Sequence, residues 1–495
     1  MPPRHKNWKG TLFLLCCLGV LKGFHGPSTL SLVDYVVENK NFTFDQMIYE
    51  VIPAIIPSLM LSFTILLMIT DALNYKPIIV VGSICSVSAW VVLIWFYDSV
   101  TLTRVHQWIH GAHTAAYELA YYTYIYTQID KSDYLRATAA THAAVLLGQF
   151  LSSLAPQILL PAKILTLPQL TYSYLGAAIA TLLISLILPK VFDAVVDEHN
   201  DMHVYTVPTV PQRRKNQVFT TSEGDDYNRT GDLQTPNDAW YLKYRNSNGP
   251  AVQKRFFQKM KEAPTQSRLN FVHAYGNMRI LKWCIWYASS YGVFWQAEAY
   301  LPTVLWGEMG GRKRGKWDGG VVLGVGAVFS AVVALIVWGT RLGRMFEWRK
   351  WDGYVLGGGS IVQGVGLLVV AKTADLYVAW GGWVVFVGVF HVLVVAVKAK
   401  IAEAILERSE AFIFGINSLM GSIIYASFTF VITSRFGLQL GIREQTSFLG
   451  GFALLLGIGF IILGILKWKK DGHFTPCAKF LEKGKCCKRR DGQAA

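Results

Sequence analysis

Apolar runs of about twenty residues recur along this chain, and each is long enough to cross a lipid bilayer as a helix. Six of these runs precede a long polar stretch and six follow it. They lie near Thr11–Val37, Gln46–Thr70, Pro77–Tyr97, Val105–Ile129, Ala137–Pro161, Gln169–Val191, Ile280–Leu305, Gly319–Gly339, Gly353–Ala371, Leu376–Val397, Ala411–Thr433 and Thr446–Leu466. We expect the first run to form a membrane helix that breaks at Gly26-Pro27. The pattern predicts an all-α integral membrane protein with about twelve transmembrane helices in two six-helix bundles.

Composition and charge agree with a membrane protein. Of the 495 residues, 52% are hydrophobic and only 16% are charged, which is not the composition of a soluble enzyme. The formal charge of +15 is spread over residues that flank the apolar runs. Because these residues form no single basic domain, we expect no nucleic-acid partner. Their distribution places both termini in the cytoplasm, with residues 312–316 as a local exception.

The polar stretch between the two sets divides the chain. It is rich in Ser, Gly, Asp and Asn, and we interpret it as a cytosolic linker. The predicted parts are an N-terminal bundle over residues 1–191, the linker over 192–279, a C-terminal bundle over 280–467 and a basic cytosolic tail over 468–495. His199 and His203 lie four residues apart in the linker, but without a third ligand motif we expect no metal site. Membrane lipid is the expected surrounding partner.

One carboxylate stands out because it lies in the middle of an uncharged membrane run. Glu118 is followed by Tyr121 and Tyr122 at i+3 and i+4, on the same face of the helix. An acid at this depth is costly and by default marks a functional site. A carboxylate beside phenol rings could bind an organic cation. The alternative is a structural acid that pairs with a neighbouring helix.

The turn between the second and third runs suggests a gate. Asp71 lies at the end of one predicted helix, and Lys76-Pro77 begins the next. Such a turn can hold a cytoplasmic gate through charge pairing and helix capping, although an ordinary capped turn has the same sequence pattern. Arg136 lies in the matching turn after the fourth run. We expect Asp71 and Arg136 to stabilise an outward-open state.

Two other classes of protein are alternatives to a transporter. An intramembrane enzyme needs a nucleophile or a metal set, and the nearest approach is His106, His110 and His113 on one helix face. We expect these histidines to contact water or lipid headgroups at the outer helix end. A receptor that does not transport would keep a pocket but lose its gates, and the presence of Asp71 and Arg136 argues against it. We therefore expect neither an enzyme nor a cofactor.

Four stretches of the sequence resemble the reduced folate carrier and thiamine transporter family, a branch of the major facilitator superfamily. The resemblance covers most of the chain outside the linker and the tail. The four stretches are Asn39-Lys40-Asn41-Phe42-Thr43 with Glu50 and Pro53; Thr70-Asp71 through Tyr75 and Pro77; Glu118 through Tyr126 with Ala143 through Gly148; and Phe414-Gly415-Ile416-Asn417 with Gly437-Leu438-Gln439-Leu440 and Arg443. The resemblance implies a twelve-helix facilitator that transports a vitamin across the plasma membrane by alternating access.

The resemblance also implies a substrate. The thiamine carriers have an acid at the position of Glu118, followed by a nearly identical tyrosine run, whereas folate carriers are basic there. Tyr425 stands where folate carriers have a lysine. A dianionic folate would need an intramembrane cation, and none is found at these positions, so thiamine is the expected substrate and a folate or other organic anion is the alternative. The departures from the family pattern are Gly26-Pro27-Ser28-Thr29, Ile55, Pro57, Val322 and His142.

The expected substrate site combines the resemblance with the intramembrane acid. Its residues are Glu118, Tyr121, Tyr122, Trp90 and Gln296. Glu118 acts as counter-ion and the aromatic rings as a stacking surface, while Glu298 is a candidate second acid. No nucleotide-binding motif occurs, so a gradient or another solute supplies the energy, and the resemblance implies a coupled proton or an exchanged organic anion. The sequon at Asn41 is the expected glycosylation site in the first exterior loop.

Overall fold

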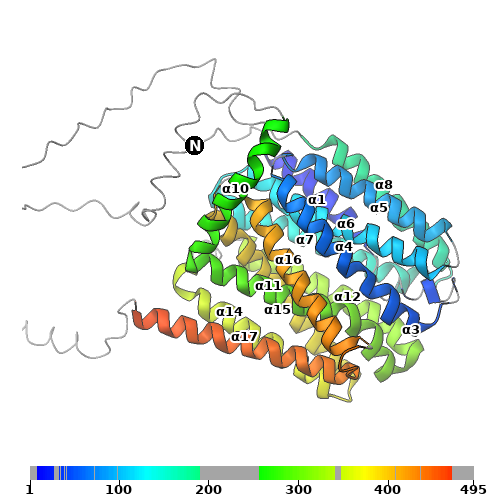
Figure 1. The fold of residues 1–495 in the computed structure, drawn as a ribbon. Helices are drawn as coiled ribbons and strands as arrows, with labels where there is room; N and C mark the ends of the chain where they lie inside the picture. The colour runs from blue at the N-terminus through cyan, green and yellow to red at the C-terminus, as the bar shows by residue number, and fades with distance from the viewer. Residues whose placement is uncertain are drawn as a thin grey trace, which may run out of the picture. The chain divides into compact units, whose positions relative to one another are not determined.

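The computed structural model describes residues 8–26, 33, 35–37, 40, 42–71, 73–96, 99–189, 256–339, 347–406, 409–434 and 436–470, and the regular elements among them are helical (Figure 1). The first half of the chain supplies α1 Trp8–His25, α3 Phe44–Gln46, η1 Met47–Val51, η2 Ile52–Ala54, α4 Ile55–Ile69, α5 Lys76–Trp95, α6 Val100–Tyr124, η3 Ile125–Thr127, η4 Lys131–Asp133, α7 Tyr134–Leu159 and α8 Leu167–Ile187. The second half supplies α10 Phe256–Gly276, α11 Met278–Tyr300, η6 Leu301–Leu305, α12 Trp306–Gly339, α14 Trp348–Lys372, α15 Leu376–Ala404, α16 Glu410–Phe428, η7 Thr429–Thr433 and α17 Ile442–Lys470.

Length and hydropathy identify the membrane-crossing helices. Within the described ranges, nine helical segments are long and apolar enough to cross a membrane. The helices α1, α6 and α11 are also long, and they carry charged and polar side chains within their apolar sequence. With these three, the helices match the predicted all-α membrane protein with two sets of six. Each of these three helices supplies a charged group to the central cavity described below, and α15 supplies a fourth.

The observed helices refine several sequence expectations. α1 ends at His25, where Gly26-Pro27 predicts a break. The C-terminal part of the expected linker contains α10, whereas residues 191–255 lie outside the described ranges, as do Asn41 and the tail from residue 471 onward. The basic stretch 312–316 lies on the helical backbone of α12, where the sequence suggested a loop. The predicted domain boundaries remain predictions.

Capping residues explain where several helices begin. At the start of α3, the Gln46 amide donates to Thr43 Oγ1 at 3.2 Å, and the Thr43 amide donates to Gln46 Oε1 at 3.0 Å. This reciprocal capping box satisfies two donors that a helix end leaves unpaired. Asp375 caps α15 in a simpler way, because its Oδ1 accepts from the amide of Tyr377 at 2.7 Å.

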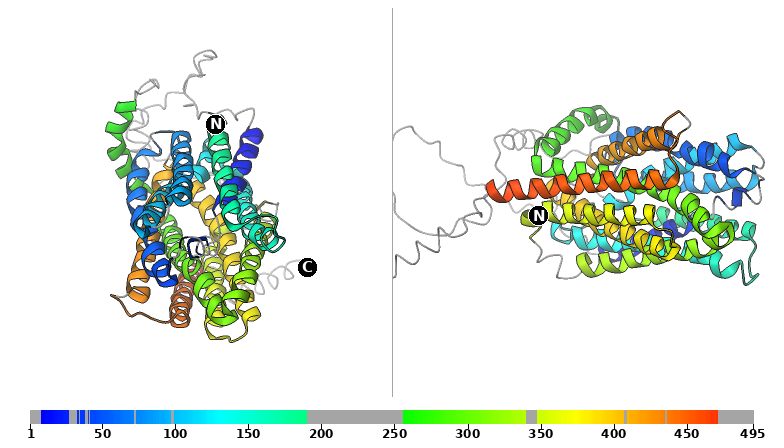
Figure 2. Two further views of the ribbon diagram at one scale, coloured as in Figure 1. Left: turned by 90° about the vertical axis from the view of Figure 1, so that its right-hand side faces the viewer. Right: turned by 90° about the horizontal axis from the view of Figure 1, so that it is seen from below.

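Helix packing within the second half depends on facing glycines. α14 lies against α17, as the views in Figure 2 show. A β-carbon on Gly357 would lie 2.8 Å from the Gly457 carbonyl oxygen, and one on Gly364 would lie 2.8 Å from that of Gly450. Both distances are closer than a side chain permits, so these positions need glycine for the two backbones to approach in lipid.

Several helix pairs join the halves of the molecule. α4 packs against α16, and α7 packs against α12 (Figure 1). The same halves also meet where α15 contacts α7. Helices α1, α6 and α7 from the first half and α11, α15 and α16 from the second half surround the central cavity. The fold therefore places side chains from both halves around one space.

Candidate substrate site

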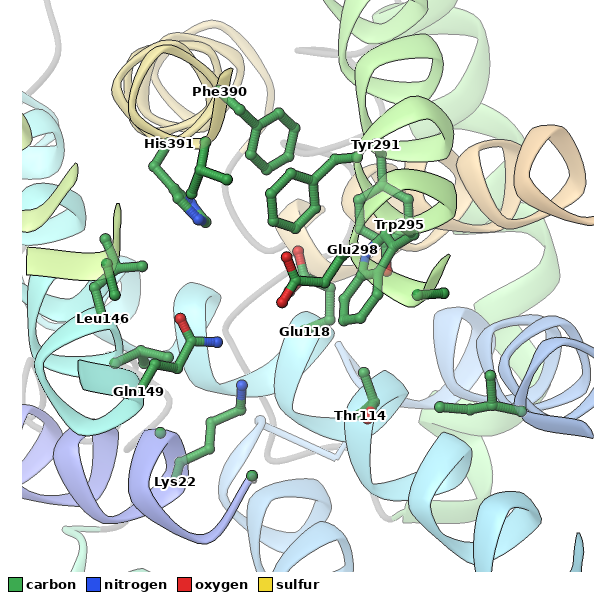
Figure 3. A pocket seen from close by; sticks show the side chains of 18 of the residues that line it. Lys22, Thr114, Glu118, Leu146, Gln149, Tyr291, Trp295, Glu298, Phe390 and His391 are labelled. Carbon is green, nitrogen blue, oxygen red and sulfur yellow. The ribbon is translucent and has the colours of Figure 1, made fainter. Parts of the chain in front are cut away.

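The cavity is lined by polar and aromatic side chains from both halves of the molecule. Figure 3 shows Lys22, Glu118 and Gln149 on the side of the first half, and Tyr291, Trp295, Glu298, Phe390 and His391 on the side of the second. The full lining also includes Trp90, His106, His110, His113, Thr114, Tyr122, His142, Tyr287, Phe294, Trp383, Lys398 and Tyr425. Charged groups inside a membrane bundle mark a solute path by default, so this cavity is the candidate substrate site.

Glu118 does not face the cavity as a free carboxylate. Its Oε1 forms an ion pair with Nζ of Lys398, on α15, and accepts a hydrogen bond from the Tyr287 hydroxyl, on α11, at 2.8 Å. The side chains of Glu118 and Lys398 are only 15% and 5% exposed. Because water screens such a pair little, the two charges are strongly coupled. The acid is thus neutralised by a cation from the opposite half.

Lys398 also lies over aromatic rings. Its Nζ is 4.1 Å from the ring centroid of Tyr122 and 5.6 Å from that of Tyr287. Both distances lie within the range in which an ammonium is attracted to a ring face. The sequence predicted a carboxylate with the rings of Tyr121 and Tyr122 for an organic cation. The structure has Tyr122 and Tyr287 beside Glu118 instead, and this group holds the ammonium of Lys398.

Two further charged groups face the same cavity. Lys22, on α1, has its Nζ 5.7 Å from the ring centroid of Tyr117. Glu298, on α11, lies on the opposite wall beside Trp295 (Figure 3). Among the described residues, neither Lys22 nor Glu298 makes a hydrogen bond or an ion pair. The cavity therefore presents an ammonium on one wall and a carboxylate on the other, both open to a ligand.

A pair of histidines joins the halves beside the ion pair. His142 Nε2, on α7, lies 2.9 Å from His391 Nδ1, on α15, and the ring of His142 is 5.6 Å from that of Tyr122. A hydrogen bond at this distance needs one imidazole to donate and the other to accept. His142, which the sequence marked as a departure from the family pattern, thus forms part of the contact between the halves.

The three histidines of α6 do not lie where the sequence predicted. His106 Nδ1 donates to the Ala89 carbonyl oxygen and His113 Nδ1 donates to that of Gly82, both at 2.9 Å and both toward α5. His106 and His113 are buried, and both line the cavity together with His110. The expectation that they contact water or lipid headgroups is wrong, because the face of α6 that carries them packs inward.

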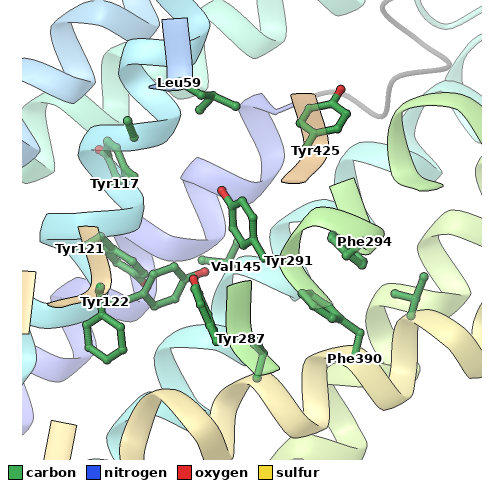
Figure 4. Packing of buried hydrophobic residues seen from close by; sticks show 14 of the residues in the cluster. Leu59, Tyr117, Tyr121, Tyr122, Val145, Tyr287, Tyr291, Phe294, Phe390 and Tyr425 are labelled. Carbon is green, nitrogen blue, oxygen red and sulfur yellow. The ribbon is translucent and has the colours of Figure 1, made fainter. Parts of the chain in front are cut away.

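Aromatic rings from both halves form the walls of the cavity. Figure 4 shows Tyr122, Tyr287, Tyr291 and Phe390 gathered there. Phe294 stacks on Phe390 with ring centroids 4.0 Å apart and an angle of 6° between the planes. Such flat ring surfaces suit a ligand that itself contains aromatic rings.

The predicted site residues separate into two groups. Glu118, Tyr122 and Trp90 line the cavity, and Trp90 also packs on Tyr174 with ring centroids 5.4 Å apart. Tyr121 is fully buried outside the lining, where its hydroxyl donates to the Leu15 and Thr141 carbonyl oxygens at 3.0 and 3.2 Å.

Gln296 also lies outside the cavity lining. Its amide donates to Thr433 Oγ1 at 3.0 Å, and its Oε1 accepts from the Thr429 hydroxyl at 2.7 Å. These contacts join α11 to the π-helical segment η7. Because α11 has 3.6 residues per turn, Gln296 and the cavity-lining Trp295 and Glu298 point in different directions. The structure therefore gives Tyr121 and Gln296 packing contacts within the helix bundle.

The predicted gate residues lie at one end of the contact between the halves. Asp71 accepts hydrogen bonds from the amides of Phe412 at 2.9 Å and Ala411 at 3.3 Å, at the start of α16, and from the Tyr75 hydroxyl at 2.7 Å. Burial raises the pKa of Asp71 to about 6, although these three hydrogen bonds act in the opposite direction. Arg136 is exposed and makes no ion pair within the described residues. The charge contact at this end therefore forms between the Asp71 carboxylate and the positive N-terminal end of α16.

Lys22 and Lys398 are the site residues that the sequence interpretation missed. Lys398 lies one residue beyond the predicted end of its run at Val397, whereas α15 continues to Ala404. The predicted span therefore excludes it. Lys22 lies within the first run, just before the predicted break at Gly26-Pro27. The rule that an ionisable residue inside a span is functional by default applies directly to Lys22, and it applies to Lys398 once the span extends to the observed end of α15. The expectation that no intramembrane cation faces the site is wrong.

A bundle of membrane helices that encloses a charged, aromatic cavity between two halves is a solute transporter. The family model described as "Reduced folate carrier" matches residues 6–448. The chain belongs to the reduced folate carrier family, which is a family of transporters and not of enzymes. The resemblance seen in the sequence is confirmed.

Relatives that are named for different substrates match over nearly the whole chain. The chain is 27% identical to "Folate transporter 1" of Caenorhabditis elegans over 472 residues, covering 94% of this chain and 95% of that protein. It is 24% identical to "Thiamine transporter 2" of Macaca fascicularis over 468 residues, covering 91% and 89%. Among solved structures, the human organic anion transporter MFSD10 matches with a TM-score of 0.55 at 12% identity, covering 93% of this chain and 100% of that one. This last likeness supports the fold alone.

Proposed function

We propose that this protein is a secondary-active transporter that moves a folate-type vitamin across the plasma membrane by alternating access to the central cavity. The observation that carries the proposal is the charge of the cavity. Lys398 already neutralises Glu118, whereas Lys22 faces the cavity with no carboxylate partner among the described residues. An unpaired ammonium in this environment favours a ligand that brings its own carboxylate.

The chemistry of a folate fits the two walls of the cavity. Its glutamate carboxylates are suitable partners for Lys22, and the N–H groups of its heterocycle can donate to the carboxylate of Glu298. Its aromatic rings can stack on the Phe294 and Phe390 rings between these ends. The similarity to a protein named folate transporter supports the same choice.

Thiamine is the second candidate, and one observation favours it. Glu118, Tyr122 and Tyr287 together form a receptor for an organic cation. Thiamine was the substrate expected from the sequence, and a protein named thiamine transporter is among the relatives. However, thiamine carries no carboxylate for Lys22, and at the receptor around Glu118 its cation would have to replace Lys398. We therefore rank it below a folate.

The orientation in the membrane and the coupling are part of the proposal. Both termini lie in the cytoplasm, the first exterior loop carries a glycan at Asn41, and a proton or an exchanged organic anion supplies the energy. Deglycosylation of native protein and of Asn41→Gln tests the orientation. Asn228-Arg229-Thr230 is a second sequon, within the expected cytosolic linker. A mobility shift that persists in Asn41→Gln and disappears in Asn228→Gln would reverse the orientation.

Uptake by one expressing cell line tests the substrate. Labelled folate, thiamine and a nucleotide are offered to cells that express native protein, Lys22→Met or Lys9→Met. Lys9 is an exposed lysine on the same helix and serves as the matched control. We expect native cells to take up folate, and Lys22→Met to lose about ten- to a hundredfold in apparent affinity for it, the usual value of a charge-assisted contact. Uptake of thiamine but not folate would overturn the choice, and uptake of neither would favour a receptor that does not transport.

A further inference from the structure

We infer that the ammonium of Lys398 occupies the cation subsite of this transporter and acts as a tethered cation, that is, a cation that belongs to the protein itself. The site therefore selects substrates that carry an anion together with either a cation or a hydrogen-bond donor. The cation subsite consists of Glu118, Tyr122 and Tyr287. The inference rests on the proposed function, because it assumes that the cavity binds the transported vitamin. It adds a residue that determines specificity.

The contacts of Lys398 are those expected for a bound organic cation. Its ammonium pairs with the Glu118 carboxylate, lies 4.1 Å above the Tyr122 ring and is 5.6 Å from the Tyr287 ring. The Tyr287 hydroxyl donates to the same Glu118 oxygen at 2.8 Å and so fixes the carboxylate toward the ammonium. A carboxylate with ring faces is the usual protein receptor for ammonium groups. A free cation therefore meets a subsite that is already filled.

The pair also connects the two halves of the molecule. Glu118 belongs to α6 of the first half, whereas Lys398 belongs to α15 of the second. The hydrogen bond between His142 and His391 joins the same halves nearby, at 2.9 Å. If the halves move apart during transport, the ion pair must open, and each charge then needs another partner.

The consequence is a rule for selectivity. A substrate with only a cation can pair with Glu118 but leaves Lys398 buried without a partner. A substrate with only an anion does the reverse. A substrate with donor groups at one end and a carboxylate at the other satisfies both residues at once. Burial of an unpaired charge is costly, so the pair discriminates against the first two classes.

Neutral variants of the pair test this rule in purified, detergent-solubilised protein. Binding of labelled folate and labelled thiamine is measured for native protein, Lys398→Met and Lys400→Met. Lys400 is two residues away on α15 and pairs with Glu403 on the same helix, outside the cavity, so it is a matched control. We expect Lys398→Met to bind thiamine at least tenfold more tightly and folate at least tenfold less tightly than native protein. Lys400→Met should keep the native ratio of the two affinities.

The outcomes separate the inference from the proposed function. A native protein that binds neither vitamin overturns the proposed function and this inference with it. A native protein that binds folate, together with a Lys398→Met variant whose ratio of affinities stays within threefold of native, overturns the inference alone. If Lys398→Met does not fold, the reversed pair Glu118→Lys with Lys398→Glu replaces it. The reversed pair restores the ion pair and should keep the native preference, and loss of that preference would contradict the tethered-cation role.

Discussion

The two halves of this transporter meet through polar contacts at two places that differ in kind. In the cavity, side chains bind side chains, as Glu118 pairs with Lys398. At the end that carries Asp71, side chains of the first half bind chiefly backbone groups of the second, beside one side-chain contact from the Tyr75 hydroxyl to Glu410 Oε2 at 3.4 Å. Asp71 accepts from the amides of Ala411 and Phe412, and Lys131 donates to the Ile405 carbonyl oxygen at 3.1 Å.

The difference indicates a division of roles. A ligand with charged groups can compete for Glu118 and Lys398, because it offers each of them an equivalent partner. The contacts of Asp71 and Lys131 lie outside the cavity lining, so a ligand in the cavity cannot replace them. They respond only when the ends of α15 and α16 move. We propose that the cavity contacts recognise the substrate and that the contacts of Asp71 hold one end of the path closed.

The largest effect on the transport rate is expected at the end that carries Asp71. Asp71→Ala removes the acceptor for two amides at the start of α16 and for the Tyr75 hydroxyl. Loss of a helix cap costs about 1 kcal/mol, and more when several contacts are lost together. We expect the transport rate to fall by about tenfold while surface abundance and folate binding stay near native values.

Uptake, surface labelling and ligand binding on the same cells test this prediction. Asp71→Asn is the matched control, because its side-chain oxygen still accepts from an amide. We expect it to keep most of the transport rate. Equal losses of binding and transport in Asp71→Ala would favour a role in folding and contradict the division between the two places.

A pH dependence of intermediate size is expected at the same contact. Burial raises the pKa of Asp71 to about 6 from an ordinary value of 3.8. The closed contact therefore binds a proton more readily than the open one. Protonation of Asp71 therefore stabilises the closed contact, and this contribution is fully present below pH 3.8 and is lost as the pH rises through 6. Closure at this end should thus be stronger at pH 5.5 than at pH 7.4.

Hydrogen exchange of the Ala411 and Phe412 amides, corrected for intrinsic rates, measures this closure. We expect severalfold greater protection at pH 5.5 than at pH 7.4 in native protein and no such difference in Asp71→Asn. Protection that is unchanged or lower at pH 5.5 in native protein would show that Asp71 does not titrate in the contact.

The smallest effect is expected at Tyr121, which separates packing from recognition on one helix. Its hydroxyl contacts backbone oxygens of α1 and α7, whereas the adjacent Tyr122 faces Lys398. Tyr121→Phe should change folate affinity by less than about twofold and lower the free energy of unfolding by about 1 kcal/mol. Tyr122→Leu should alter the affinity clearly. A larger change in affinity for Tyr121→Phe than for Tyr122→Leu would place Tyr121 at the site after all.

The sequence predicted the helices well because about twenty apolar residues have one stable form in a bilayer. It also placed Glu118, Tyr122 and Trp90 at the cavity, because an acid inside a span needs a reason, Tyr122 follows it at i+4, and the resemblance completed the expected site. It could not distinguish Tyr121 from Tyr122, because neighbours 100° apart on a helix both lie near the acid. It also could not predict that Glu118 is paired, because the partner comes from a helix 280 residues away in the chain.

The most direct test of the account is folate uptake by Glu118→Gln in the presence of competing thiamine. The amide keeps the shape of the side chain and an acceptor oxygen but removes the negative charge, which releases Lys398 for a carboxylate of the substrate. We predict that the apparent affinity for folate stays within about threefold of native, whereas thiamine loses about ten- to a hundredfold as a competitor. Equal losses for both vitamins, or a variant in which thiamine competes as well as in native protein, would contradict the claim that the site balances both charges of its substrate.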